Sequence, residues 1–219
     1  MPLRPLADVS VADWFADDGS SPLPHNLGPA GFSSYVRVLH SDRGDGERYE
    51  GHLDDDLLAA LVAVLSGHTS TPDDCYFGLW DGYGDIDGGD PVGFLTAFSG
   101  PMKWPGRIFT KEKPPPPVPP AFAPEVLAGP KLSYFHDYLL FRGKLAEAGQ
   151  WGAVGYGYGV PRDINSPNLM WPADHAWFVT TSIEGTWTGV GGSAVLIDEL
   201  LKEPRLEVVR QRYDVTELR

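Results

Sequence analysis

Two histidine–aspartate pairs carry the residue types best suited to acid–base chemistry or metal binding. They are His136-Asp137 and Asp174-His175. Each pair lies within or beside a run that alternates as a β-strand does, so neighbouring side chains point to opposite faces and each pair offers one member to a shared site. Asp137, Asp174 and His175 are therefore the candidate acid–base residues of an enzyme. A structural hydrogen-bond network is the interpretation that we favour.

Asp137 is the most informative of these groups, because the other residues on its face of the expected strand are Phe and Leu. A carboxylate among apolar side chains must be paired or protonated. Arg142 or Arg107 could pair with it. An ion pair of this kind would make Asp137 a structural residue.

Residues 166–177 form the densest cluster of aromatic residues and prolines, with the sequence SPNLMWPADHAW. Proline fixes φ, and asparagine or aspartate can bind its own backbone, so we expect a rigid loop that enters a strand. Such a loop either packs within the fold or presents its rings to a ligand. In the second case, the pocket of a small-molecule enzyme or sensor would be lined by Trp80, Tyr138, Trp171 and Trp177.

An acidic loop follows the expected strand 75–80. Its carboxylates belong to Asp81, Asp85, Asp87 and Asp90. Their spacing does not fit a calcium-binding EF-hand loop, in which positions 1 and 12 would be Tyr83 and Phe94. We therefore predict no metal and no cofactor, and we interpret the segment as a flexible acidic loop that binds a basic protein.

The net charge of −13 comes from the first half of the chain. Residues 1–100 hold 17 acidic and 4 basic side chains, whereas residues 101–219 hold 13 of each. Nucleic-acid binding requires a basic surface, so this charge argues against a DNA or RNA partner. The simplest interpretation is a solvated face that favours solubility, and the alternative is an acidic surface that steers a basic protein partner.

A single cysteine, Cys75, excludes an internal disulfide, and the neighbouring Asp73 and Asp74 would raise the pKa of its thiol. We expect this thiol to be buried and unreactive. The first residues lack the apolar run of a signal peptide, and the longest apolar segment, residues 57–65, is too short to cross a bilayer. These features predict a cytoplasmic protein without a membrane partner.

Hydrophobic periodicity places these residues in an α+β fold. The clearest helix is 54–66, where three aspartates form an acidic first turn before an apolar stripe. A second helix, 194–202, follows a glycine-rich turn at 189–193, and a short helix begins at Ser10. Strands are expected at 32–40, 75–80, 133–142, 175–184, 187–190 and 207–209.

A tract with 8 prolines in the 20 residues 111–130 interrupts this pattern. Polyproline II geometry is favoured there, and we expect a surface excursion rather than a linker, because strands on its two sides would pair best in one sheet. The sequence thus predicts a single domain over residues 1–219, with a mainly antiparallel sheet and two or three helices packed on it.

Four segments resemble a family of uncharacterised actinobacterial proteins. They are residues 32–40, 75–84, 166–177 and 190–193. The resemblance covers most of the chain outside the proline-rich tract and implies no particular activity. The order of helix, acidic loop, sheet and closing helix is also similar to that of SUKH-type domains, which include immunity proteins of bacterial toxin systems. We therefore expect a non-enzymatic protein-binding module, such as an immunity or inhibitor protein, with the small-molecule enzyme or sensor as the alternative.

Overall fold

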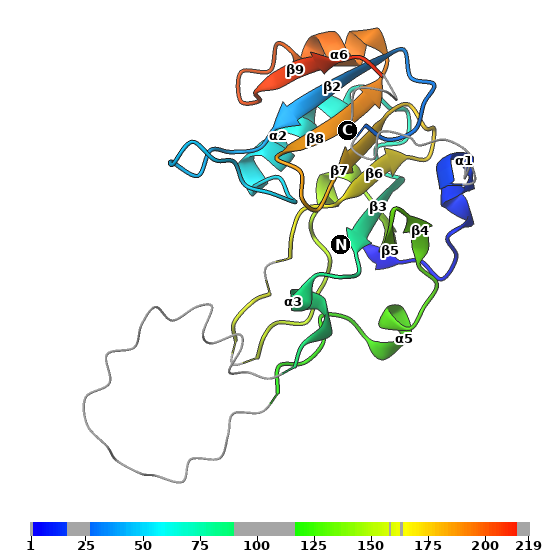
Figure 1. Cartoon of the computed structure of the whole chain (residues 1–219). Helices are drawn as coiled ribbons and strands as arrows, with labels where there is room; N and C mark the ends of the chain where they lie inside the picture. Colours follow the sequence, from blue (N-terminus) through cyan, green and yellow to red (C-terminus); the bar gives the residue numbers. More distant parts are fainter. Residues whose placement is uncertain (1, 17–26, 90–116, 158, 163, 214–219) are drawn as a thin grey trace.

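Nine strands form one sheet in the computed structural model, which describes residues 2–16, 27–89, 117–157, 159–162 and 164–213 (Figure 1). The strand order is β1-β5-β3-β6-β7-β8-β2-β9, with β4 paired to β5, and every pairing is antiparallel. The strands are β1 (Arg4–Pro5), β2 (Ser34–Leu39), β3 (Cys75–Trp80), β4 (Leu132–Tyr134), β5 (His136–Gly143), β6 (Leu169–Pro172), β7 (Phe178–Thr181), β8 (Trp187–Gly192) and β9 (Val208–Gln211). Strands from both sides of the proline-rich tract pair in this sheet, and the predicted α+β class is confirmed.

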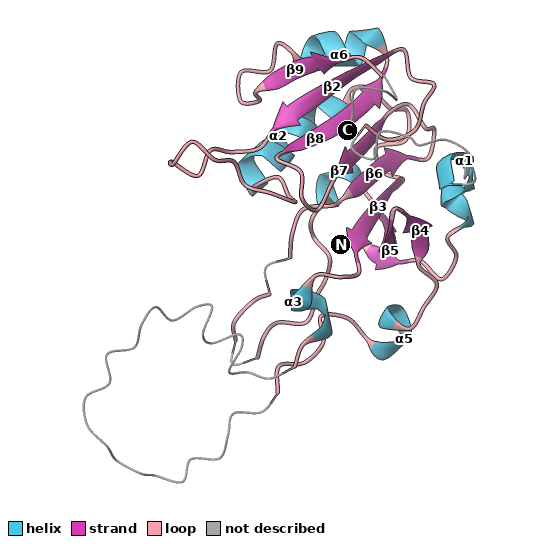
Figure 2. Cartoon of the chain, viewed as in Figure 1, coloured by secondary structure: helices cyan, strands magenta, loops and turns pink. Residues whose placement is uncertain are grey.

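The helices are short apart from α2 (Figure 2). They are α1 (Asp13–Ala16), α2 (Asp55–Ser66), α3 (Gly84–Asp87), α5 (Pro124–Leu127) and α6 (Ala194–Leu200), with 3-10 turns η1 (Ser10–Ala12) and η2 (Leu145–Glu147). The predicted start of α2 is confirmed, because the Asp54 carboxylate accepts the N–H of Leu57 at 3.0 Å. Among the described residues, no helix has the length and apolar character needed to span a membrane.

The two faces of the sheet are covered by different parts of the chain. On one face, α2 and α6 bury side chains such as Leu61 and Ile197 against the strands. On the other face, the N-terminal segment packs Phe15 onto a cluster of aromatic rings. Alternate residues of β5 enter the two layers, with Leu139 in the first and Tyr138 in the second, so β5 is covered on both sides as its composition predicted.

The single strand expected at residues 133–142 is two strands. β4 and β5 form a hairpin that reverses at Phe135, whose φ of 61° lies in the left-handed region. The apolar alternation continues in phase through the turn, so periodicity alone could not reveal it. A non-glycine residue in this conformation is uncommon and here closes a very tight reversal.

The loop expected at residues 166–177 contains a strand. Residues 169–172 form β6 between β3 and β7, and Trp171 lies opposite Tyr76. His175 then adopts a φ of 55° in the turn, so the strand expected from this residue begins only at Phe178. The prolines that suggested a loop are tolerated because Pro167 precedes the strand and Pro172 is its last residue.

The glycine-rich segment 189–193 is also part of the sheet. Gly191 and Gly192 are the last residues of β8, and only Ser193 acts as the predicted cap of α6, accepting the N–H of Leu196 at 3.2 Å. A Cβ atom at Gly191 would lie 2.7 Å from the rings of Phe32 and Tyr35. Glycine is therefore required here because aromatic rings pack closely over the strand, and not because the chain turns.

The second half of the proline-rich tract packs against the body of the protein. Residues 111–116 lie outside the described residues, but Val118 exchanges two backbone hydrogen bonds with Gly89. Ala121 and Phe122 enter the core layer under α2 and α6. This part of the expected surface excursion therefore contributes to the core.

Candidate functional site

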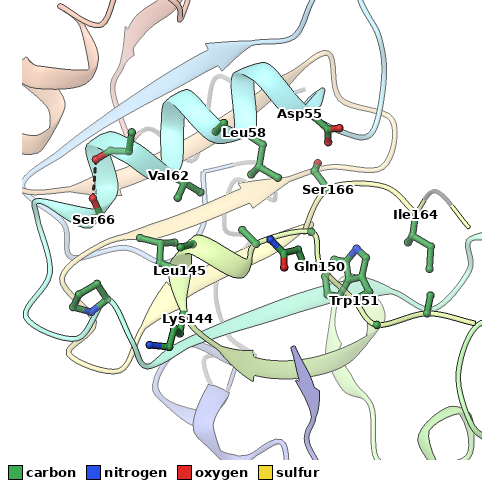
Figure 3. Close-up of a pocket in the computed structure, with 18 of the residues that line it drawn as sticks. Asp55, Leu58, Val62, Ser66, Lys144, Leu145, Gln150, Trp151, Ile164 and Ser166 are labelled. Carbon is green, nitrogen blue, oxygen red and sulfur yellow. Dashed lines mark hydrogen bonds between the residues drawn. The ribbon is translucent and has the colours of Figure 1, made fainter. Parts of the chain in front are cut away.

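A groove of about 910 Å³ runs between α2 and residues 144–153 (Figure 3). Its α2 wall consists of Asp55, Leu58, Ala59, Val62, Ala63 and Ser66, and its facing wall includes Lys144, Leu145, Ala146, Ala148, Gly149, Gln150 and Trp151. The α2 residues are spaced at three or four positions, so they form one stripe along three turns of the helix. The groove therefore follows the whole length of α2.

The α2 wall is partly apolar because the apolar residues of this helix extend beyond the stripe that is buried against the sheet. Leu61 and Leu65 are fully buried against the sheet. Ala59 and Ala63 are exposed, and Val62 is partly buried on the groove side. An apolar helix face that borders a groove is suited to contact with another apolar surface.

The facing wall is held by backbone and side-chain hydrogen bonds. After β5, the N–H of Leu145 bonds to the carbonyl of Pro72 at 2.8 Å, and the Glu147 carboxylate accepts the N–H of Lys144 at 3.1 Å. Trp151 is almost fully buried and donates its indole N–H to the carbonyl of Asn165 at 3.0 Å. The wall is therefore a fixed surface, although it contains no strand.

The two ends of the groove differ in charge. At the α2 N-terminus, no described residue makes a hydrogen bond or ion pair with the carboxylates of Asp55 and Asp56, and both residues are exposed. At the other end, Lys144 and Asp73 form an exposed ion pair of 2.8 Å, and this hydrogen bond raises the pKa of Lys144. One end of the groove therefore carries carboxylates that no ion pair among the described residues neutralises.

Arg162 also borders the groove, but its guanidinium is engaged inside the fold. It donates to the carbonyls of Asp85, Pro119 and Val154 and lies 4.6 Å from the ring centre of Tyr156. These contacts tie the loop after β3 to residues 119 and 154. Arg162 therefore adds no free cation to the groove.

The predicted acidic loop is partly engaged by neighbours. Asp81 forms an ion pair with Lys131, and Asp85 accepts the hydroxyl of Tyr156 at 2.8 Å. Asp87 belongs to α3, whereas Asp90 lies outside the described residues. Among the described residues, no group of three or more His, Cys, Asp or Glu could hold a metal ion.

The candidate acid–base residues do not converge. Asp137 lies opposite the end of β3, where its carbonyl accepts the N–H of Asp81 at 2.9 Å. Asp174 lies near the start of β3, because the preceding residue, Ala173, donates its N–H to the carbonyl of Asp74. Seven residue steps along β3 separate Asp74 from Asp81, so the backbone positions of Asp174 and Asp137 lie about 23 Å apart along the strand. The shared acid–base site considered from the sequence is therefore not formed.

The environment of Asp137 differs from the one expected, whereas Asp174 binds its own backbone as expected and accepts the N–H of Ala176 at 3.2 Å. Asp137 is exposed rather than surrounded by apolar side chains. Of its two expected partners, Arg142 binds Asp74 with two hydrogen bonds of 2.6 and 2.8 Å, and Arg107 lies outside the described residues. Asp174 accepts from Thr69 and from both the N–H and hydroxyl of Ser70. The role of Asp174 is thus to fix the loop before β3.

His175 stacks on Trp14 with 4.3 Å between the ring centres. Burial lowers the pKa of its imidazole, although the nearby Asp174 carboxylate opposes this shift. The Cys75 thiol is buried, and its pKa is raised to about 12 by burial and by Asp74 and Asp174. Such a thiol is a poor nucleophile.

The four predicted pocket rings do not line one cavity. Trp171 and Trp177 are fully buried in the layers on opposite faces of the sheet. Tyr138 is almost fully buried on the same face as Trp171. Only Trp80 reaches a hollow, a shallow cleft of about 490 Å³ that it shares with Asp81 and Asp137.

Sequence reasoning therefore missed the main groove. The signal was available in α2, where Ala59, Val62 and Ala63 extend the apolar surface beyond the stripe of leucines. The facing wall gave no comparable signal, since residues 144–153 lack any periodicity.

No protein-family model, curated protein or solved structure matches this chain. The arrangement of its own residues thus carries the functional argument.

Proposed function

We propose that this chain is a non-enzymatic protein-binding module that holds a basic partner protein in the groove between α2 and residues 144–153. An immunity or inhibitor protein, as the resemblance to SUKH-type domains implies, would use such a surface to cover its target. A cytoplasmic location is part of this proposal, since the one cysteine gives the chain no dependence on an oxidising compartment.

The groove is the observation that carries the proposal. Its lining combines apolar and small side chains with polar ones such as Ser66 and Gln150, and its ends are charged. Protein interfaces combine an apolar centre with a polar rim in this way. The candidate acid–base residues Asp137 and Asp174, in contrast, lie at opposite ends of β3, which favours binding over catalysis.

The charge distribution supports a basic partner. The excess of acidic residues lies in the first 100 residues, and Asp55 brings that charge to one end of the groove, with Asp56 next to it on α2. Opposite charge accelerates encounter and selects among partners, and the effect is screened by salt. A partner with a net positive surface would therefore bind fastest at low ionic strength.

The test compares wild type, Ala63→Arg and Val195→Arg as immobilised baits. Ala63 lies in the groove, whereas Val195 is 69% exposed on α6 and serves as a matched control outside the groove. A basic protein retained by wild type and Val195→Arg, but lost from Ala63→Arg, supports the proposal. Equal retention by all three baits contradicts it, and so does a purified complex whose affinity does not change between about 50 and 500 mM salt.

A further inference from the structure

The backbone of the two walls limits which kind of polypeptide segment can bind in the groove. The α2 wall is a helix, so its main-chain groups are bonded within the helix. In the facing wall, the N–H groups of five residues already bond within the chain; these residues are Leu145, Glu147, Ala148, Gln150 and Trp151. Neither wall is a strand.

An extended peptide would therefore find no sheet edge in this groove. Binding by strand addition depends on main-chain hydrogen bonds to an exposed edge, and buried backbone groups without partners are costly. A helix satisfies its own main-chain groups and needs only side-chain contact from the walls. The walls thus favour a helical occupant.

The length of the groove sets the length of this helix. The α2 wall extends from Asp55 to Ser66, which corresponds to about 16 Å at 1.5 Å per residue. A helix of about three turns covers this distance. Its contact face would carry apolar residues at positions i, i+3, i+4 and i+7 to meet Ala59, Val62 and Ala63, which reach the surface of the α2 wall.

Charge decides the direction of the helix. The carboxylates of Asp55 and Asp56, which form no ion pair with a described residue, lie at the N-terminal end of α2. Basic residues of the occupant must lie at this end. Lys and Arg stabilise the last turn of a helix, and antiparallel helices align their dipoles favourably. In an antiparallel occupant, the last turn with its basic residues lies beside Asp55 and Asp56.

We propose that the groove binds an amphipathic helix of the partner protein, about three turns long, antiparallel to α2 and with a basic last turn beside Asp55 and Asp56. This inference rests on the proposed function and adds the chemistry and direction of the bound segment. It excludes extended and proline-rich peptides as the segment that binds in the groove.

The experiment uses a phage-displayed library of 14-residue peptides with all positions randomised, selected on the purified full-length protein. We expect the enriched peptides to show apolar residues at helical spacing and Lys or Arg in the last turn. We also expect the Asp55→Lys/Asp56→Lys double variant to bind these peptides with about tenfold lower affinity. Glu125→Lys on α5 is the charge control and should leave affinity unchanged.

Ala63→Arg should abolish binding of the enriched peptides, while Val195→Arg should not. Thermal unfolding of each variant establishes that it is folded. If Ala63→Arg removes binding but the peptides show a period of two, or no basic last turn, the helical occupant is refuted and the binding groove stands. If no peptide is enriched, or Ala63→Arg leaves binding intact, the groove itself is refuted as the binding site.

Discussion

A buried hydroxyl network offers a sharp test of how this fold is stabilised. His40 is 1% exposed and its Nδ1 lies 2.8 Å from the carbonyl oxygen of Tyr49. A carbonyl oxygen only accepts, so Nδ1 carries the proton, and in the neutral imidazole Nε2 accepts from the hydroxyl of Thr188 at 2.9 Å. Thr188 in turn lies 2.8 Å from the hydroxyl of Thr181, which is therefore the donor.

Thr188→Val removes the central hydroxyl of this network with almost no change in shape. The substitution leaves Nε2 of His40 without a donor and the hydroxyl of Thr181 without an acceptor, both in buried positions. Each unsatisfied buried group costs about 1–3 kcal/mol. We therefore expect the free energy of unfolding to fall by about 2–6 kcal/mol, a large part of the stability of an ordinary domain.

Urea unfolding at pH 7.5, followed by tryptophan fluorescence and by circular dichroism, measures this change. Thr186→Val, at a partly buried position one residue before β8, is the matched control and should stay within about 0.5 kcal/mol of wild type. A loss of less than about 0.5 kcal/mol in Thr188→Val would refute the assigned network. So would a loss equal to that of the control.

Three further predictions concern single groups. Burial lowers the pKa of the His40 imidazole, so the folded protein favours the neutral form. The free energy of unfolding should therefore decrease as pH falls below about 6.5. In urea titrations, His40→Gln should reduce this dependence on pH. Asp54→Ala removes the cap of α2 and should cost about 1 kcal/mol, whereas Asp54→Asn should keep most of it; equal losses would argue against capping. Cys75, with a pKa of about 12, should resist iodoacetamide at pH 8 until urea unfolds the chain; rapid labelling of the native protein would contradict its burial.

Local signals in the sequence were sufficient for several elements. Asp54 and the apolar stripe after it located α2, since capping and amphipathicity are encoded within one helix. The run 75–80 was assigned as a strand with its observed bounds, because a buried central strand is apolar on both faces. The burial of Cys75 also followed from its immediate neighbours.

Other elements depended on partners distant in the sequence. Residues 169–172 form β6 only because β3 and β7 lie on either side, and the prolines nearby concealed this pairing. Gly191 was interpreted as a turn because nothing in the local sequence shows that the rings of Phe32 and Tyr35 lie over it.

The candidate site shows the same division. The sequence by itself determined the α+β class, the capped helix α2 and the acidic first half of the chain, because composition and periodicity are properties of short segments. Only the tertiary structure decided that Asp137 and Asp174 lie at opposite ends of β3, and that residues 144–153 face α2 across a groove. The physical reason is that strand order and packing fix which distant segments meet, and no local pattern contains that information.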